Sequence, residues 1–259
     1  MRFTLPSRTV RLETLLLCVM VSGWAAVSSA QDALRFVAVA PGISHASFDV
    51  YPPDSDAFSG HAFRIDLGDA ELRLVPAGGP SPRQTVAQIA SQFPAVVAVN
   101  ASFFDTDGRA MGLSVSDGRL LTAAKRPSWG AFTLSGTDAR IVLGSVIADP
   151  LAHQLVVQGL PRLVVGGRIP GLKPQVAERT AVCAAGNRVV IVVVTKAEST
   201  AFARFLAEPA EKNGLACPDA LNLDGGPTTQ LVVRLPGLSL SVPGGWGVPN
   251  ALVAIPGKK

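Results

Sequence analysis

The chain has 259 residues, which is enough for one large domain or two small ones. Charged residues make up 16% and hydrophobic residues 48% of it, and this balance excludes an intrinsically disordered chain. The net charge is only +4, and Lys and Arg do not cluster with aromatic residues, so no nucleic-acid partner is expected. No stretch approaches the roughly 18 consecutive apolar residues that a membrane span needs.

The N-terminal segment has the layout of a secretory signal peptide. Arg2, Arg8 and Arg11 precede an apolar run over residues 15–27, and small residues follow as far as Ala30. We therefore expect residues 1–30 to be a signal peptide and the mature protein to be periplasmic or secreted; an uncleaved anchor is the alternative. Cleavage would lower the net charge from +4 to +2, because three Arg and one Glu are lost.

Two cysteines, Cys183 and Cys217, remain after removal of the segment that carries Cys18. An even number of cysteines in an exported chain favours a disulfide between them. Two separate buried thiols are the alternative.

The first predicted elements lie before residue 76. Residues 34–39 form a candidate strand, and a polar stretch around residues 52–56 follows without a periodic pattern. We take residues 31–60 as an N-terminal extension of a domain that spans residues 61–259. Apolar and polar residues alternate loosely over residues 61–75, which predicts a half-buried hairpin.

A short helix and a buried strand are predicted next. Thr85 and Gln88 have the spacing of a capping box, and apolar residues recur at helical spacing up to Phe93, before Pro94. Residues 95–99 are wholly apolar and rich in valine, which is typical of a strand buried on both faces. This strand would place Asn100 at its end.

The remaining pattern predicts many strands and one more helix, which Ser199 would cap and which would run to about Glu208. The fold class that follows is α+β, a single domain with mixed or antiparallel sheets and few helices. Further strands are expected at residues 112–115, 131–134, 139–143, 155–157, 163–165, 180–184, 188–194, 220–223, 230–233 and 251–255.

The motifs of several enzyme classes are absent from the sequence. It contains no H-E-x-x-H zinc helix, no G-x-S-x-G nucleophile turn and no glycine-rich phosphate loop. We predict no cofactor and no metal. Calcium at Asp105, Asp107 and Gly108 is a minor alternative, because the spacing of an EF-hand loop is not met and a hairpin turn explains these residues better.

Polar residues follow apolar strands at two places. Asn100, Ser102 and Asp105 come after the strand at residues 95–99, and Asp224 and Thr228 lie between two apolar strands. Buried polar groups cost free energy unless they are bonded, so these side chains are candidates for a site. The alternative is that Asn and Asp only cap turns.

Glycine and arginine residues nearby offer ways to bind an anion. Gly225 and Gly226 would let the backbone approach a ligand, and their N–H groups could form an anion-binding nest. Arg179 stands just before a predicted strand and could clamp a phosphate with two parallel bonds. A turn, and a surface ion pair of Arg179 with Glu178 or Asp219, are the respective alternatives.

Taken together, these segments resemble the phosphodiester glycosidase family. The resemblance runs from about Phe63 to Pro256 and has two departures. Ala101 and Ser102 stand where the family often has two glycines, and Pro227 removes one N–H from the nest. The motifs that carry it, in chain order, are A-V-N-A-S-F-F-D at residues 98–105, Q-G-L-P-R-L at residues 158–163, R-T-A-V at residues 179–182, A-L-N-L-D-G-G-P-T-T at residues 220–229 and V-P-N-A-L at residues 248–252.

The resemblance implies hydrolysis of a sugar joined through its anomeric carbon to a phosphodiester. Arg179, with N–H groups near Gly225 and Gly226, would hold the phosphate, and Asp224 would stabilise the oxocarbenium-like centre or activate water. Asp105 is the second-choice catalytic carboxylate. Sugar hydroxyls would be bound by Asn100, Ser102 and Asn250, with support from Thr180 and Thr228.

Two other classes of function fit the same residues. An exported module could bind anionic envelope glycans without turnover, and an exported structural protein could use these loops only as turns. Convergence of Asn100, Arg179, Asp224 and Asn250 in one place would argue against the structural protein.

Overall fold

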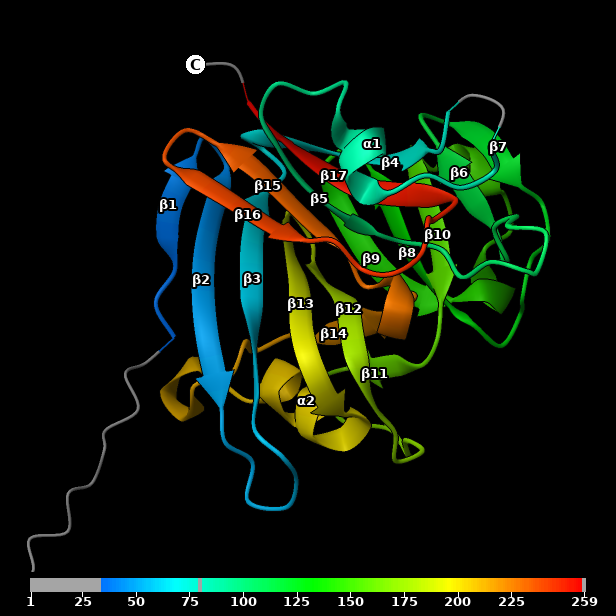
Figure 1. Cartoon of the computed structure of the whole chain (residues 1–259). Coiled ribbons are helices and arrows are strands. Elements are labelled where there is room, and N and C mark those ends of the chain that lie inside the picture. The colour runs from blue at the N-terminus through cyan, green and yellow to red at the C-terminus, as the bar shows by residue number, and fades with distance from the viewer. Residues whose placement is uncertain (1–33, 79–80, 258–259) are drawn as a thin grey trace, which may run out of the picture. The chain divides into compact units, whose positions relative to one another are not determined.

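Antiparallel strand pairing builds almost the whole fold (Figure 1). The computed structural model describes residues 34–78 and 81–257, in three sheets and two α-helices, and every pairing between these strands is antiparallel. The expected α+β class with few helices is therefore confirmed. The signal peptide expected at residues 1–30 lies outside the described residues.

The largest sheet, called here the large sheet, has seven strands. Its order is β1-β2-β3-β13-β12-β14-β11. Its strands are β1 (Val37–Ala40), β2 (Ile43–Val50), β3 (Phe58–Asp66), β11 (Arg162–Val164), β12 (Val176–Ala185), β13 (Arg188–Glu198) and β14 (Asp219–Asn222).

Two five-stranded sheets accompany it. The second sheet has the order β7-β6-β10-β8-β9, with β6 (Ser114–Ser116), β7 (Arg119–Thr122), β8 (Gly130–Ser135), β9 (Asp138–Leu143) and β10 (Leu155–Gly159). The third sheet has the order β16-β15-β5-β17-β4, with β4 (Ala70–Pro76), β5 (Val96–Asn100), β15 (Leu231–Leu235), β16 (Leu238–Val242) and β17 (Asn250–Pro256).

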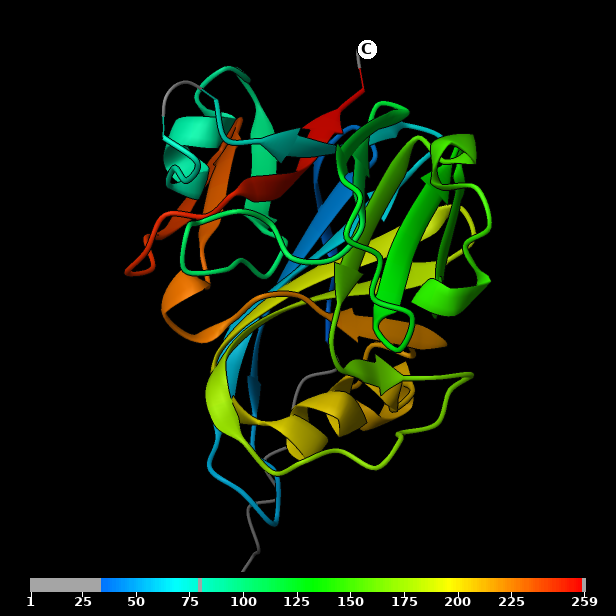
Figure 2. The same ribbon diagram turned by 90° about the vertical axis from the view of Figure 1, so that its right-hand side faces the viewer.

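The core lies on both faces of the large sheet. Alternate residues of a strand point to opposite faces, so Val193 of β13 joins the cluster shared with the second and third sheets, whereas Val192 and Val194 pack toward α2. Figure 2 shows α2 on one side of the large sheet and the two smaller sheets on the other. The face toward the smaller sheets is the one that carries the candidate site.

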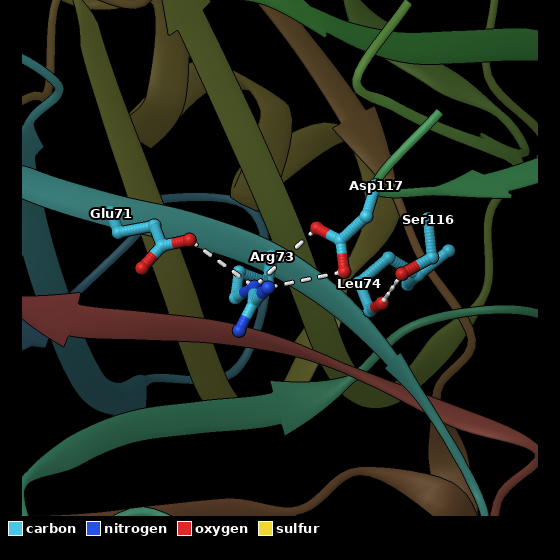
Figure 3. Close-up of polar contacts among 5 residues, drawn as sticks. All are labelled: Glu71, Arg73, Leu74, Ser116 and Asp117. Carbon is cyan, nitrogen blue, oxygen red and sulfur yellow. Dashed lines mark hydrogen bonds and ion pairs between the residues drawn. The ribbon is translucent and has the colours of Figure 1, made fainter. Parts of the chain in front are cut away.

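Polar contacts connect the second and third sheets at their edges (Figure 3). Arg73 of β4 donates to both carboxylate oxygens of Asp117, at 3.4 and 3.2 Å, and forms an ion pair with Glu71 at 3.2 Å. Asp117 and Gly118 both have positive φ in the β6–β7 turn, as a two-residue hairpin turn requires.

The two helices begin where the sequence indicates, with one correction. Helix α1 (Val86–Ala90) has the predicted capping box of Thr85 and Gln88. Helix α2 (Ser199–Ala207) is capped by Glu198, whose carboxylate accepts the N–H groups of Thr200 and Ala201. The prediction of Ser199 as the cap is wrong, because the longer Glu198 side chain already reaches those orphan donors. Short 3-10 turns lie at η1 (Gly144–Val146), η2 (Pro150–Ala152), η3 (Ala210–Lys212) and η4 (Gly226–Thr228).

The predicted hairpin over residues 61–75 is wrong. Its two strands exist, but β3 pairs with β2 and β13 in the large sheet, whereas β4 pairs with β17 in the third sheet. Period-2 alternation shows that a strand has one buried face, but it does not determine which other strand pairs with it. Strands β2, β7 and β16 have no counterpart among the predicted strands. The ten strands predicted beyond residue 110 are all present.

The predicted disulfide between Cys183 and Cys217 is present. It links β12 to the segment between α2 and β14, and both residues are buried beside α2. Among the described residues, no helix is long and apolar enough to cross a membrane.

Reduction of this disulfide is expected to lower the free energy of unfolding by about 3 to 4 kcal/mol, because the bond closes a loop of 34 residues. Denaturant unfolding with and without reductant measures the difference. A Cys183→Ser, Cys217→Ser variant serves as the control and should show no response to reductant. An equal response from the double variant would contradict this origin of the stability.

Candidate active site

The side-chain amide of Asn100 is the centre of the polar cluster. Asn100 ends β5 in the third sheet and is fully buried. Its Oδ1 accepts the Thr180 hydroxyl at 2.7 Å and the Gln230 N–H at 3.0 Å, and its Nδ2 donates to the Asp224 carbonyl at 2.6 Å. Thr180 lies on β12 of the large sheet, so one side chain joins two sheets and the loop that carries Asp224.

Asp224 places a half-buried carboxylate next to this cluster. Its backbone follows β14, and its N–H donates to the Ala101 carbonyl at 3.1 Å. Burial raises the pKa of the Asp224 carboxyl above its ordinary value, and hydrogen bonds from Thr228 and from the Gly225 N–H act in the opposite direction. A half-buried carboxylate with a raised pKa is a better proton acceptor than an ordinary one.

The two glycines after Asp224 have different functions in the structure. The Gly225 N–H donates to the Asp224 carboxylate at 2.9 Å, and a Cβ at Gly225 would lie 2.8 Å from the Glu178 carbonyl oxygen. Gly225 is therefore required for close approach to β12. Gly226 has a φ of +63° and begins η4. Since the Gly225 N–H is already bonded and Pro227 has none, the expected two-donor nest is reduced to Gly226.

Ser102 and Asn250 form a reciprocal pair beside Asn100. The Ser102 N–H donates to Asn250 Oδ1 at 3.0 Å, and Asn250 Nδ2 donates to Ser102 Oγ at 3.0 Å. Both side chains are almost fully buried. The polar groups of Asn100, Ser102 and Asn250 therefore bond to the protein itself, and this placement gives no support to the expected contacts with sugar hydroxyls. Thr228 likewise donates to the Gly225 carbonyl at 2.8 Å.

Arg179 lies on the opposite face of β12 from Thr180. Its guanidinium donates to the Ala197 carbonyl at 3.1 Å, to Ser199 Oγ at 2.8 Å and to the Gln175 carbonyl. Ala197 lies at the end of β13, Ser199 begins α2, and Gln175 directly precedes β12. The structure does not bring this guanidinium to Asp224, because consecutive residues of a strand face opposite ways. Arg179 holds α2 to the large sheet, and this placement gives no support to the expected phosphate clamp.

The Asp105 side chain stabilises a turn. Its Oδ1 accepts the N–H groups of Asp107 at 3.0 Å and of Arg109 at 2.9 Å. Gly108 has a φ of +81° there, so the predicted hairpin turn is found. Asp105 also lines a groove of about 650 Å³ with Phe104 and Trp246. In the described part of the chain, no group of three or more His, Cys, Asp or Glu side chains could hold a metal ion.

Sequence reasoning missed a cavity of about 340 Å³ next to the Asp224 loop. Thr229 from this loop lines it, together with Glu178, His61 and Asp49 from the large sheet. From the sequence, the role expected for Glu178 is an ion pair with Arg179, and no such pair forms among the described residues. The signal that could have revealed the cavity is the change from apolar to polar residues on alternate positions of β2 and β3.

Three antiparallel sheets thus place the half-buried Asp224 carboxylate in a loop whose end, Thr229, lines this cavity. A catalytic carboxylate is typical of a glycosidase-like hydrolase. The chain belongs to the phosphodiester glycosidase family, whose sequence model matches residues 93–255. The resemblance found in the motifs is thereby confirmed. No curated protein matches the chain.

Three solved structures share the fold. The catalytic domain of zebrafish N-acetylglucosamine-1-phosphodiester α-N-acetylglucosaminidase, auto-inhibited by its pro-peptide, has a TM-score of 0.62 at 19% identity and covers 88% of this chain and 87% of its own. A hypothetical protein from Synechocystis gives 0.54 at 18% identity, with 83% and 62% covered. A protein from Burkholderia pseudomallei described as exported gives 0.55 at 15% identity, with 77% and 74% covered.

Replacement of Asn100 tests the centre of the cluster. Asn100→Ala should lower the free energy of unfolding by about 3 kcal/mol, because it leaves the buried Gln230 N–H and Thr180 hydroxyl without their partner. Denaturant unfolding measures the loss. Asn187→Ala, the same change in an exposed turn, should stay within about 0.5 kcal/mol of the parent protein. A loss below about 1 kcal/mol for Asn100→Ala would show that the cluster does not depend on this amide.

Proposed function

We propose that the protein is an exported hydrolase that releases a sugar from a sugar-1-phosphodiester of envelope or extracellular glycan. The family membership supports the reaction class. The observation that carries the proposal is the half-buried Asp224 carboxylate with its raised pKa, held by the Gly225 N–H in a loop that Asn100 fixes.

In the proposed reaction, Asp224 accepts a proton from water while the water oxygen forms a bond to the anomeric carbon. The bond between that carbon and the phosphate oxygen breaks, and its electron pair leaves with the phosphate. A departing phosphate monoester is a weak base, with a second pKa near about 6. It therefore needs no strong general acid, unlike the alkoxide that leaves in ordinary glycoside hydrolysis.

The remaining motif residues are proposed to keep Asp224 in position. Asn100, bonded to Thr180, fixes the loop, and the pair of Ser102 and Asn250 fixes the chain that follows β5. The Thr228 hydroxyl donates a hydrogen bond to the Gly225 carbonyl. The Gly226 N–H is proposed to contact the phosphate, because it is the donor of the glycine pair that does not bond to Asp224. Arg179 has no place in this mechanism.

Export to the periplasm or the medium is part of the proposal. The signal-peptide pattern over residues 1–30 supports it, and so does the Cys183–Cys217 disulfide, since disulfides persist in oxidising compartments.

Incubation of the purified protein with a panel of sugar-1-phosphodiesters, followed by assay for free sugar, tests the reaction. Release of free sugar is the expected result. Binding of the panel members without release would indicate the alternative, a module that binds anionic envelope glycans.

Asp224→Asn should lower kcat by about 100-fold or more, since an amide cannot accept the proton. In the parent protein the rate should fall as the pH drops through the raised pKa of Asp224. Asp138→Asn, a change in an exposed residue paired with Arg140, is the matched control and should retain the parent rate. Full activity of folded Asp224→Asn would refute the assignment.

The same substitution has a predicted effect on stability. A carboxyl whose pKa is raised by folding stabilises the protein only at low pH, and this contribution is lost as the pH rises through the folded-state pKa. Asp224→Asn should therefore be as stable as the parent protein or more stable at pH 7. Thermal unfolding at neutral pH checks that its inactivity does not come from misfolding.

A further inference from the structure

The inner face of the large sheet changes from apolar to polar along the same strands. Under the smaller sheets, alternate positions of β2 and β3 carry Ile43, Phe63 and Ile65, which are buried in the core. Farther along, the same alternation brings Ser47 and Asp49 of β2 opposite His61 and Ser59 of β3. Figure 1 shows β2, β3 and β13 continuing past β16, and the last residue of β16, Val242, lines the cavity on this part of the face.

The polar part of this face lines the 340 Å³ cavity, and the end of the segment that carries Asp224 contributes Thr229 to the same lining. Thr229 connects the glycine turn after Asp224 to the cavity. Its N–H donates to the Gly226 carbonyl at 2.9 Å, and the residue lines the cavity. The Thr229 hydroxyl is buried and has no hydrogen-bond partner among the described residues. A buried unpaired hydroxyl costs free energy, which a ligand in the cavity would recover.

A β-bulge brings Glu178 to the same place. Ala177 pairs with Ala197 and Arg179 with Val194, so two residues of β13 stand opposite the single residue Glu178. Bulges redirect side chains and are common next to active sites. Glu178 lines the cavity, and its carbonyl oxygen lies against Gly225. Glu178 therefore lines the cavity at the point where its backbone meets the loop of Asp224.

The charge of the cavity is negative. Asp49 and Glu178 both line it and form no ion pair within the described parts of the chain, and no Lys or Arg lines it. The nearest cations in sequence do not change this, because Arg179 faces α2 and Lys196 is not a lining residue. Burial lowers the pKa of His61, which favours its neutral form at pH 7. The neighbouring His45, at 3.1 Å, has a lowered pKa as well.

We propose that this cavity holds the sugar of the substrate, and that Glu178, with Asp49, makes a sugar with a protonated amine the preferred one. The proposal rests on the proposed function and names its substrate class. Two uncompensated carboxylates repel a phosphate or a uronic acid and attract an ammonium group. The sugar would thus lie on the polar floor with its anomeric carbon toward Asp224, and the phosphate would point out of the cavity.

The test uses three substrates that share one methyl phosphodiester group and differ only in the sugar: glucosamine, glucose and glucuronic acid, each linked through C1. For the mature protein, kcat/KM should be at least tenfold higher for the glucosamine phosphodiester than for the glucose phosphodiester. It should be lowest for the glucuronic acid phosphodiester. In Glu178→Gln, the values of kcat/KM for the glucosamine and glucose phosphodiesters should differ by no more than about threefold. Glu211→Gln, which changes an exposed carboxylate on η3, should keep the parent ratio.

A binding measurement separates this proposal from the proposed function. Calorimetry with free glucosamine and free glucose, on the parent protein and on Glu178→Gln, needs no turnover. Glucosamine binding that weakens at least fivefold in Glu178→Gln, without cleavage of any substrate, would support the cavity and overturn the hydrolase. Cleavage of glucose and glucosamine phosphodiesters at equal efficiency, or equal binding of both sugars, would overturn the cavity's preference and leave the hydrolase standing.

Discussion

The buried amide of Asn100 is the interaction on which the arrangement of the site depends. It receives a hydroxyl from the large sheet and an N–H from the start of β15, and it donates to the backbone of the Asp224 loop. The Thr180 hydroxyl and the Gln230 N–H are buried, so the loss of their partner costs about 1 to 3 kcal/mol for each. No apolar side chain could replace Asn100, because the two sheets would then face each other across unpaired polar groups.

Because of this constraint, most residues of the motifs support the site, and Asp224 is left to carry out the chemistry. Asn100, Ser102, Thr180 and Asn250 all direct their polar atoms into the protein, and Arg179 does so on the other face of β12. Such a fully bonded frame is rigid, and a rigid frame is what an active carboxylate needs in order to stay in place. Asp224 is the motif side chain that this frame leaves half-buried, with its pKa raised.

Local patterns were sufficient to predict much of the fold and less of the site. The capping box at Thr85 and the valine-rich run before Asn100 are set by neighbours in sequence, and both were predicted correctly. Partners of strands depend on the whole topology, so the separation of β3 from β4 into two sheets could not be read from their alternation. The position of Glu178 depends on the bulge opposite β12, which has no signature in the sequence.

The central claim is that Asn100 and its partners hold Asp224 at the anomeric carbon of a sugar-1-phosphodiester. A crystal structure of the Asp224→Asn protein with an uncleaved glucosamine-1-phosphodiester tests it most directly. We predict the sugar in the cavity lined by Glu178 and Thr229, with its anomeric carbon about 3 to 4 Å from the side chain of residue 224. A ligand bound elsewhere, for example in the groove between Phe104 and Trp246, would contradict the claim.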